Sequence, residues 1–152
     1  MDLGVYVVSL ASMVYGQQPA KIVSVWDKGK TGVDEHEAIV FQYGSGATAN
    51  LSCSSRVTIT PKAKIWGTKG GIEIHENFYC SRKVKLNAEG QREREVNHPY
   101  PGSGYQFEAD HAAKCIMEGK SESEIMGLDE TVSIMETLDA IRRPWGLKYP
   151  NE

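Results

Sequence analysis

The chain has 152 residues, of which 40% are apolar and 24% charged, and 15 glycines stand against 6 prolines. This composition is typical of one folded globular domain and excludes a disordered, collagenous or coiled-coil chain. The formal charge of −3 provides no basic field for collecting phosphates, so we expect no nucleic-acid partner. Cys53, Cys80 and Cys115 are widely spaced and form no Cys-x-x-Cys pair. They indicate reduced thiols in a cytoplasmic protein, without a metal site.

The first predicted element is a buried helix over residues 3–15, an apolar run that Gly16 ends. A run of this length falls well short of the roughly 20 residues that cross a bilayer, and it lacks the basic start of a signal peptide. We therefore expect no membrane association. Asp2 and the apolar run follow Met1 directly, without a polar leader, so we expect a fragment whose start methionine was added.

A sheet is predicted next, because apolar residues alternate in short runs separated by glycine. The predicted strands are residues 20–26, 36–43, 47–54, 62–67, 71–74, 83–86 and 92–96, of which six or seven form the sheet. Gly44 to Gly46 supply a tight turn between the second and third runs. In the third run, Ala47, Ala49, Leu51 and Cys53 alternate with small polar residues and define its inward face.

The second run has apolar residues on both faces. Ile39, Phe41 and Tyr43 lie on one side, while Ala38 and Val40 lie on the other. A solvated antiparallel face is normally polar, so this pattern predicts that a partner surface covers the second face.

Two helices close the chain, over residues 105–116 and from Asp129, a candidate cap, to just before Pro144. The first carries Tyr105, Glu108, Ala112, Cys115 and Ile116 on one face, and the second carries an apolar stripe of Ile134, Leu138 and Ile141. The sequence predicts an α+β fold: a mostly antiparallel, six- or seven-stranded open sheet with helices packed on one face. We expect a single domain over residues 1–152.

Residues 44–49 read G-x-G-x-x-A, the letters of a dinucleotide-binding fingerprint. That fingerprint requires a helix after the glycines, whereas the residues after Gly46 alternate as a strand. We interpret the segment as a hairpin turn. No Walker-type phosphate loop occurs either.

Three groups of polar residues are candidates for chemistry. Asp2 and Tyr6 are four residues apart, so a helix places them on one face as a possible proton-transfer pair. From spacing alone, a capping Asp2 and a core Tyr6 are the favoured alternative. Glu108 and His111 have the Glu-x-x-His spacing of di-iron bundles, but the single copy favours a structural hydrogen-bond pair. His36, among Asp34, Glu35 and Glu37, is interpreted as part of a solvated edge.

Four segments together suggest a family. Residues 2–6 resemble the D-x-G-x-[YH] segment that opens the C-terminal domain of the Gfo/Idh/MocA oxidoreductases, and residues 65–74 resemble that family's I-x-G-[ST]-x-G strand pair. Residues 104–119 resemble its G-[YF]-x-x-E-x-x-H helix, and residues 128–143 its closing helix in the dihydrodiol dehydrogenase branch. The resemblance covers essentially the whole chain, in the right order.

The resemblance implies a two-domain enzyme that transfers hydride between NAD or NADP and a sugar, polyol or diol. It implies that an N-terminal Rossmann domain, absent from this chain, binds most of the cofactor and supplies a catalytic lysine. Tyr6 and Asp2 are then the catalytic residues, Glu108 and His111 are structural, and the open sheet face forms a homodimer. The isolated chain is expected to be inactive. The alternative is a free-standing dimerisation or small-molecule-binding module without catalytic activity, in which Tyr6 only packs.

Overall fold

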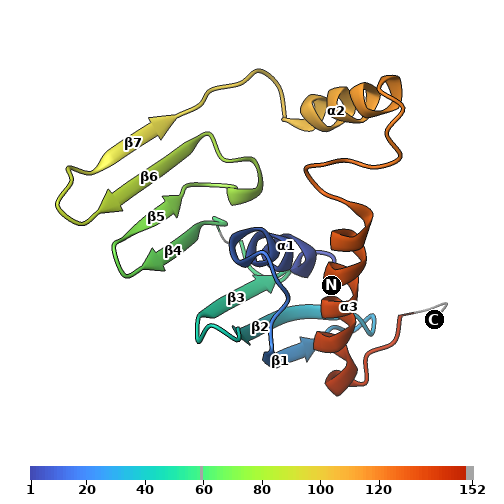
Figure 1. Ribbon diagram of the computed structural model, residues 1–152. Coiled ribbons are helices and arrows are strands. Elements are labelled where there is room, and N and C mark those ends of the chain that lie inside the picture. Colours follow the sequence, from blue (N-terminus) through green and yellow to red (C-terminus); the bar gives the residue numbers. More distant parts are fainter. Residues whose placement is uncertain (59, 150–152) are drawn as a thin grey trace. The chain divides into compact units, whose positions relative to one another are not determined.

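In a computed structural model, residues 1–58 and 60–149 are described, and they form seven antiparallel strands and three α-helices (Figure 1). The chain divides into two compact units, unit 1 with residues 1–58 and 124–152 and unit 2 with residues 59–123. The α+β class and the strand number are therefore confirmed. The strands are distributed over two open sheets, one in each unit.

The sheet of unit 1 is an antiparallel meander of β1 (Lys21–Lys28), β2 (Asp34–Gln42) and β3 (Thr48–Ser54). The β2–β3 connection is a tight turn in which Gly46 has a φ of 87°, a conformation that glycine adopts without a steric penalty. The Tyr43 N–H donates to the Ala47 carbonyl across this turn. The interpretation of residues 44–49 as a hairpin rather than a nucleotide-binding turn is thus confirmed.

Helices α1 (Gly4–Tyr15) and α3 (Leu128–Arg142) supply the core of unit 1 together with one face of this sheet. The buried residues are the inward positions of β2 and the apolar stripes of both helices: Val8, Ala11, Ile39, Phe41, Tyr43, Ile134, Leu138 and Ile141. Gly16 ends α1 in a left-handed conformation, as the sequence predicted. The prediction that Asp129 caps α3 is wrong. Gly127 occupies the N-cap position, and no side-chain hydrogen bond caps this end of the helix.

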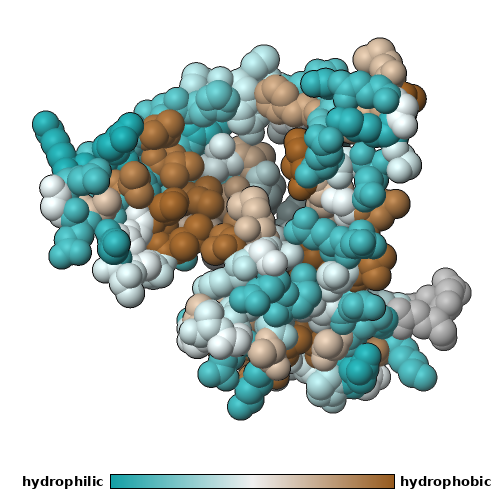
Figure 2. Space-filling model, in the orientation of Figure 1, coloured by the Kyte–Doolittle hydropathy of each residue, from teal (hydrophilic) through white to brown (hydrophobic). Residues whose placement is uncertain are grey.

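Unit 2 contains a second meander, β4 (Ala63–Gly67), β5 (Gly70–Ile74), β6 (Lys83–Ala88) and β7 (Arg94–Asn97), as well as α2 (Tyr105–Met117). Strand alternation gives this sheet one apolar face, on which Ile72 lies between its partners Ile65 and Leu86. Figure 2 shows hydrophobic side chains gathered over these strands. The opposite face carries ion pairs such as Lys64–Glu73 and Lys83–Glu95.

On α2, the structure buries less than the sequence predicted. Cys115 is buried, but Tyr105 and Ile116 of the predicted apolar face are 70% and 75% exposed. None of the helices within residues 1–58 and 60–149 has the length and apolar character needed to cross a bilayer.

Candidate functional site

Tyr6 projects from the first turns of α1 on the side away from the core. The helix buries Gly4, Val8, Ala11 and Ser12 against the rest of unit 1, and Tyr6 lies off this stripe with 43% of its surface exposed. The favoured sequence interpretation, a core tyrosine, is therefore wrong. An exposed phenol on a helix whose other face is fixed by packing is accessible to a ligand and held in place by the fold.

Asp2 lies in the turn that precedes α1 and is exposed. The Val5 N–H donates to the Met1 carbonyl at 3.2 Å, so the backbone from Met1 to Val5 already turns as a helix does. Leu3, not Asp2, is the cap residue, and no side-chain cap bond forms at this end. The capping interpretation of Asp2 is thus wrong as well. The helical turn keeps Asp2 and Tyr6 at the four-residue spacing that places two side chains on one face.

A buried polar cluster lies at the same end of unit 1. The Cys53 thiol donates a hydrogen bond to Glu37 Oε2 at 2.6 Å, and Glu37 is 3% exposed. The Tyr149 hydroxyl donates to Asp34 Oδ1 at 2.6 Å, and the Met1 ammonium lies 2.7 Å from Asp34 Oδ2. The prediction that the carboxylates around His36 form a solvated edge is wrong for Asp34 and Glu37, although His36 itself is exposed.

The carboxyl groups of this cluster have displaced pKa values. Burial raises the pKa of Glu37 to about 7, with a further contribution from Asp34. Burial acts in the same direction on Asp34, but hydrogen bonds from the Met1 ammonium, Tyr149 and Glu37 outweigh it and lower the pKa of Asp34. Burial, followed by the bond to Glu37, raises the pKa of the Cys53 thiol, so this thiol is a weak nucleophile.

Glu108 and His111 do not form the predicted hydrogen-bond pair. His111 Nε2 lies 2.9 Å from Ser123 Oγ and 3.5 Å from Cys115 Sγ, while Glu108 is exposed on α2. Within the described part of the chain, no hydrogen bond joins the two residues. The contacts of His111 are those of a side chain that fastens α2 to the segment after it.

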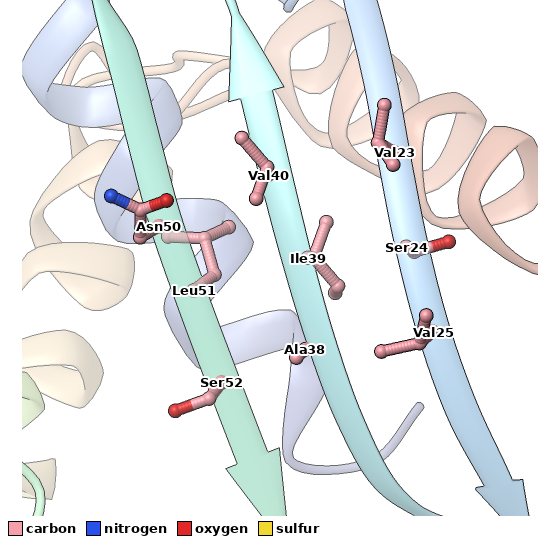
Figure 3. Close-up of a pocket in the computed structure, with 9 residues that line it drawn as sticks. All are labelled: Val23, Ser24, Val25, Ala38, Ile39, Val40, Asn50, Leu51 and Ser52. Atoms are coloured by element: carbon pink, nitrogen blue, oxygen red, sulfur yellow. The ribbon is translucent and has the colours of Figure 1, made fainter.

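The outward face of the sheet in unit 1 is open and apolar at its centre (Figure 3). Val23 pairs with Val40, and Val25 pairs with Ala38, on the face that α1 and α3 do not cover. The exposed fraction is 55% for Val23, 67% for Val25 and 42% for Val40. Together with Asn50 and Ser52 of β3, these valines line a shallow hollow of about 360 Å³. The apolar second face that the sequence predicted is confirmed. That a partner surface covers it remains a prediction.

Within residues 1–58 and 60–149, no turn of the dinucleotide-binding type is found. The only sequence with the letters of a nucleotide fingerprint, residues 44–49, connects two antiparallel strands and has no helix after its glycines. A pyrophosphate is normally bound by the N–H groups at such a helix. No group of three or more potential metal ligands comes together within the described residues.

Comparisons with known proteins agree with the resemblance seen in the sequence. Residues 1–73 match a family model described as GFO/IDH/MocA C-terminal domain. The chain is 30% identical, over 159 aligned residues, to trans-1,2-dihydrobenzene-1,2-diol dehydrogenase of Oryctolagus cuniculus, and 29% identical to the human protein of that name. The alignments include the whole chain but 48% and 47% of those proteins, so the chain spans about half the length of the curated relatives it matches.

Solved structures share the fold. An aldose-aldose oxidoreductase from Caulobacter crescentus, complexed with glycerol, superposes with a TM-score of 0.78 at 24% identity, over 94% of this chain and 44% of that one. A 3-ketoreductase from Actinomadura kijaniata, in complex with TDP-benzene and NADP, superposes with a TM-score of 0.77 at 16% identity, over 93% of this chain and 45% of that one.

Proposed function

We propose that the chain, whose residues 1–73 match the Gfo/Idh/MocA C-terminal domain, is the substrate-side and dimerisation domain of an NAD(P)-dependent oxidoreductase. The substrate class is a sugar, polyol or diol. The observation that carries this proposal is the alignment of the whole chain with one half of dehydrogenases that act on a dihydrobenzene diol. The other half of such an enzyme is proposed to be a Rossmann domain that binds NAD or NADP, since residues 44–49, which carry the letters of a nucleotide fingerprint, form a hairpin.

Tyr6 is the residue proposed to act on substrate. Oxidation of an alcohol requires that its hydroxyl proton leave, and the reverse reaction requires that a proton be supplied to the carbonyl oxygen. An exposed phenol near the start of a rigidly packed helix can exchange that proton, and the first turn of a helix stabilises negative charge that develops there. Asp2, one helical turn before Tyr6, is proposed to orient the phenol or its hydrogen-bond partner.

The open sheet face of unit 1 is proposed to form a homodimer. Val23, Val25, Ala38 and Val40 line an apolar, shallow hollow in the centre of an otherwise polar face. Exposed apolar patches of this kind mark interfaces, and a two-fold dimer brings the same patch of both subunits together. Glu108 and His111 are proposed to keep the structural role that the family resemblance implies.

An activity assay tests the proposal. The 152-residue chain and the proposed full-length enzyme are each given NADP and trans-1,2-dihydrobenzene-1,2-diol, then a panel of aldoses and polyols, and NADPH formation is followed by absorbance. We expect turnover by the full-length protein and none by the chain alone, because the nicotinamide must be held in near contact with the substrate carbon. Turnover by the isolated chain, or substrate binding by the full-length protein without any nucleotide-dependent reaction, would contradict the proposal.

A further inference from the structure

An irregularity in β2 brings two carboxyl groups together inside unit 1. In the ladder with β1, Asp27 pairs with His36 but Lys28 pairs with Asp34, so Glu35 is an extra residue in β2. Such a bulge shifts the alternation of side chains by one position. Asp34 thereby joins Glu37 on the inner side of the sheet, although regular alternation would place the two on opposite faces.

The pair is enclosed on several sides. The side chain of Asp34 is 4% exposed and Glu37 is 3% exposed, and the negative charge of Asp34 contributes to the raised pKa of Glu37. Cys53, which donates to Glu37, lies under the first turn of α1: a Cβ placed on Gly4 would be 3.8 Å from its sulfur. The carboxyl pair is therefore connected, through Cys53, to the residues at which α1 begins.

The charges that face the pair favour one proton on it. Two adjacent buried carboxylates repel each other, so such pairs retain a single proton between them. The Tyr149 hydroxyl donates to Asp34 Oδ1 at 2.6 Å, which favours the negative charge on Asp34 rather than on Glu37. Arg142 of α3 lies over the Tyr149 ring at 5.3 Å and adds a positive charge on this side. On the β3 side, Glu37 meets the Cys53 thiol, which offers a proton but no positive charge.

We propose that Asp34 and Glu37 form a buried one-proton carboxyl pair beneath the start of α1, and that loss of the proton from Glu37 destabilises unit 1. The pair is a pH-sensitive element of the fold. It does not depend on the proposed oxidoreductase function, since neither residue contacts substrate in that proposal.

The direction of the pH effect follows from linkage. The pKa of Glu37 is raised from 4.5 to about 7 in the folded state, so the folded chain binds more protons than the unfolded chain between these values. Stability is then greatest near pH 4.5, decreases as the pH rises toward 7, and levels off above it. Asp34, whose pKa is lowered, has the opposite effect, but only at pH values below about 4.

The test is urea unfolding of the full 152-residue chain between pH 5 and pH 8. A Trp66→Phe background leaves Trp26 and Trp145, both in unit 1, as the fluorescent reporters. In this reference protein we expect the folding equilibrium constant of unit 1 to decrease on the order of 100-fold from pH 5 to pH 8. With Glu37→Gln, which stays neutral, we expect the decrease to fall to about threefold or less.

Glu35→Gln is the matched control, because Glu35 lies in the same bulge but pairs with Arg56 at 2.6 Å on the exposed side. The Glu35→Gln variant should retain the full pH dependence. The exposed His36 is present in every variant, so it cannot account for a difference between them. A reference protein without the decrease, or an equal decrease in Glu37→Gln, would overturn the proposal.

If Glu37→Gln does not fold, infrared spectroscopy of the reference protein decides. We expect a carboxylic-acid C=O stretch at pH 6 that shifts when glutamate is labelled with ¹³C at its carboxyl carbon and disappears in urea. Absence of that band from the folded protein would also overturn the proposal.

Discussion

Trp145 stacks on Trp26, with ring centroids 5.1 Å apart and ring planes 10° from parallel. Trp145 ends the short 3₁₀ helix Arg143–Trp145 that follows α3, and its indole N–H donates to Ser24 Oγ at 2.9 Å. Trp26 and Ser24 belong to β1. The aromatic pair therefore fastens the end of α3 to the first strand of the sheet and links the two sequence segments of unit 1.

Replacement of Trp145 should destabilise unit 1. We expect Trp145→Ala to lower its free energy of unfolding by about 3 kcal/mol, since it removes a stacked, partly buried ring. Ser24→Ala, which removes only the hydrogen bond, should cost about 1 kcal/mol. Urea titration followed by far-UV circular dichroism measures both values. Equal losses in the two variants would mean that the stacking contributes nothing to stability.

The proposed dimer interface predicts that lysine substitutions at two exposed valines, Val40 and Val132, have different effects on the oligomeric state. Val40→Lys places a charge in the centre of the open face and should convert a micromolar dimer into a monomer. Val132→Lys is the control, because Val132 is 55% exposed but lies on α3, away from that face. Sedimentation velocity distinguishes the two species. A wild-type monomer at micromolar concentration, or a dimeric Val40→Lys variant, is incompatible with this interface.

Tyr6 should be required for the chemical step. In the proposed full-length oxidoreductase, we expect Tyr6→Phe to lower kcat by about 100-fold or more, with a small change in KM, because only proton transfer is lost. Tyr15→Phe is the matched control: Tyr15 is on the same helix, but its hydroxyl donates to the Thr48 carbonyl in a structural contact. Its kcat should stay within about threefold of wild type. Steady-state kinetics with the diol measures both, and a Tyr6→Phe enzyme with wild-type kcat would remove Tyr6 from the mechanism.

Tyr149 should contribute to stability in a pH-dependent way. Its hydroxyl donates to Asp34, and a hydrogen bond to a charged acceptor is worth about 1.5–3 kcal/mol. Tyr149→Phe should therefore lower the free energy of unfolding by about that amount at pH 7. Because the pKa of Asp34 is lowered in the folded state, this difference should persist down to about pH 4 and diminish at lower pH, where Asp34 is protonated. Acid titration of the two proteins in urea tests this, and a constant difference down to pH 2 would contradict it.

Most of the fold could be predicted from the sequence because it depends on local signals. The period-two pattern located all seven strands, and the observed bounds of β3 differ from the predicted ones by a single residue. Gly16 and Gly46 have the positive φ values expected of the residues that end a helix and close a hairpin. The stripe of Ile134, Leu138 and Ile141 is buried as its helical spacing predicted. The division into two sheets depends on whether β3 pairs with β4, which alternation within single strands does not encode.

The candidate site was less predictable, for a physical reason. The bulge at Glu35 moves Asp34 to the inner face, so the run of charged residues around His36 resembled a solvated edge, whereas two of its carboxyl groups are buried. Only the pairing with β1 defines this irregularity. Tyr6 was assigned to the core from spacing, yet the packed stripe of α1 runs through Val8 and Ala11 and leaves Tyr6 exposed. A short apolar helix gives little indication of which face it buries.

The most direct test of the central claim is to read the genomic DNA immediately upstream of the codon for Asp2. If the chain is the substrate-side domain of an oxidoreductase, the reading frame should continue upstream for about 120 residues or more and encode a strand, a glycine-rich turn and a helix. A stop codon followed by a ribosome-binding site at that position would contradict the account, and the free-standing binding module would then be the better description.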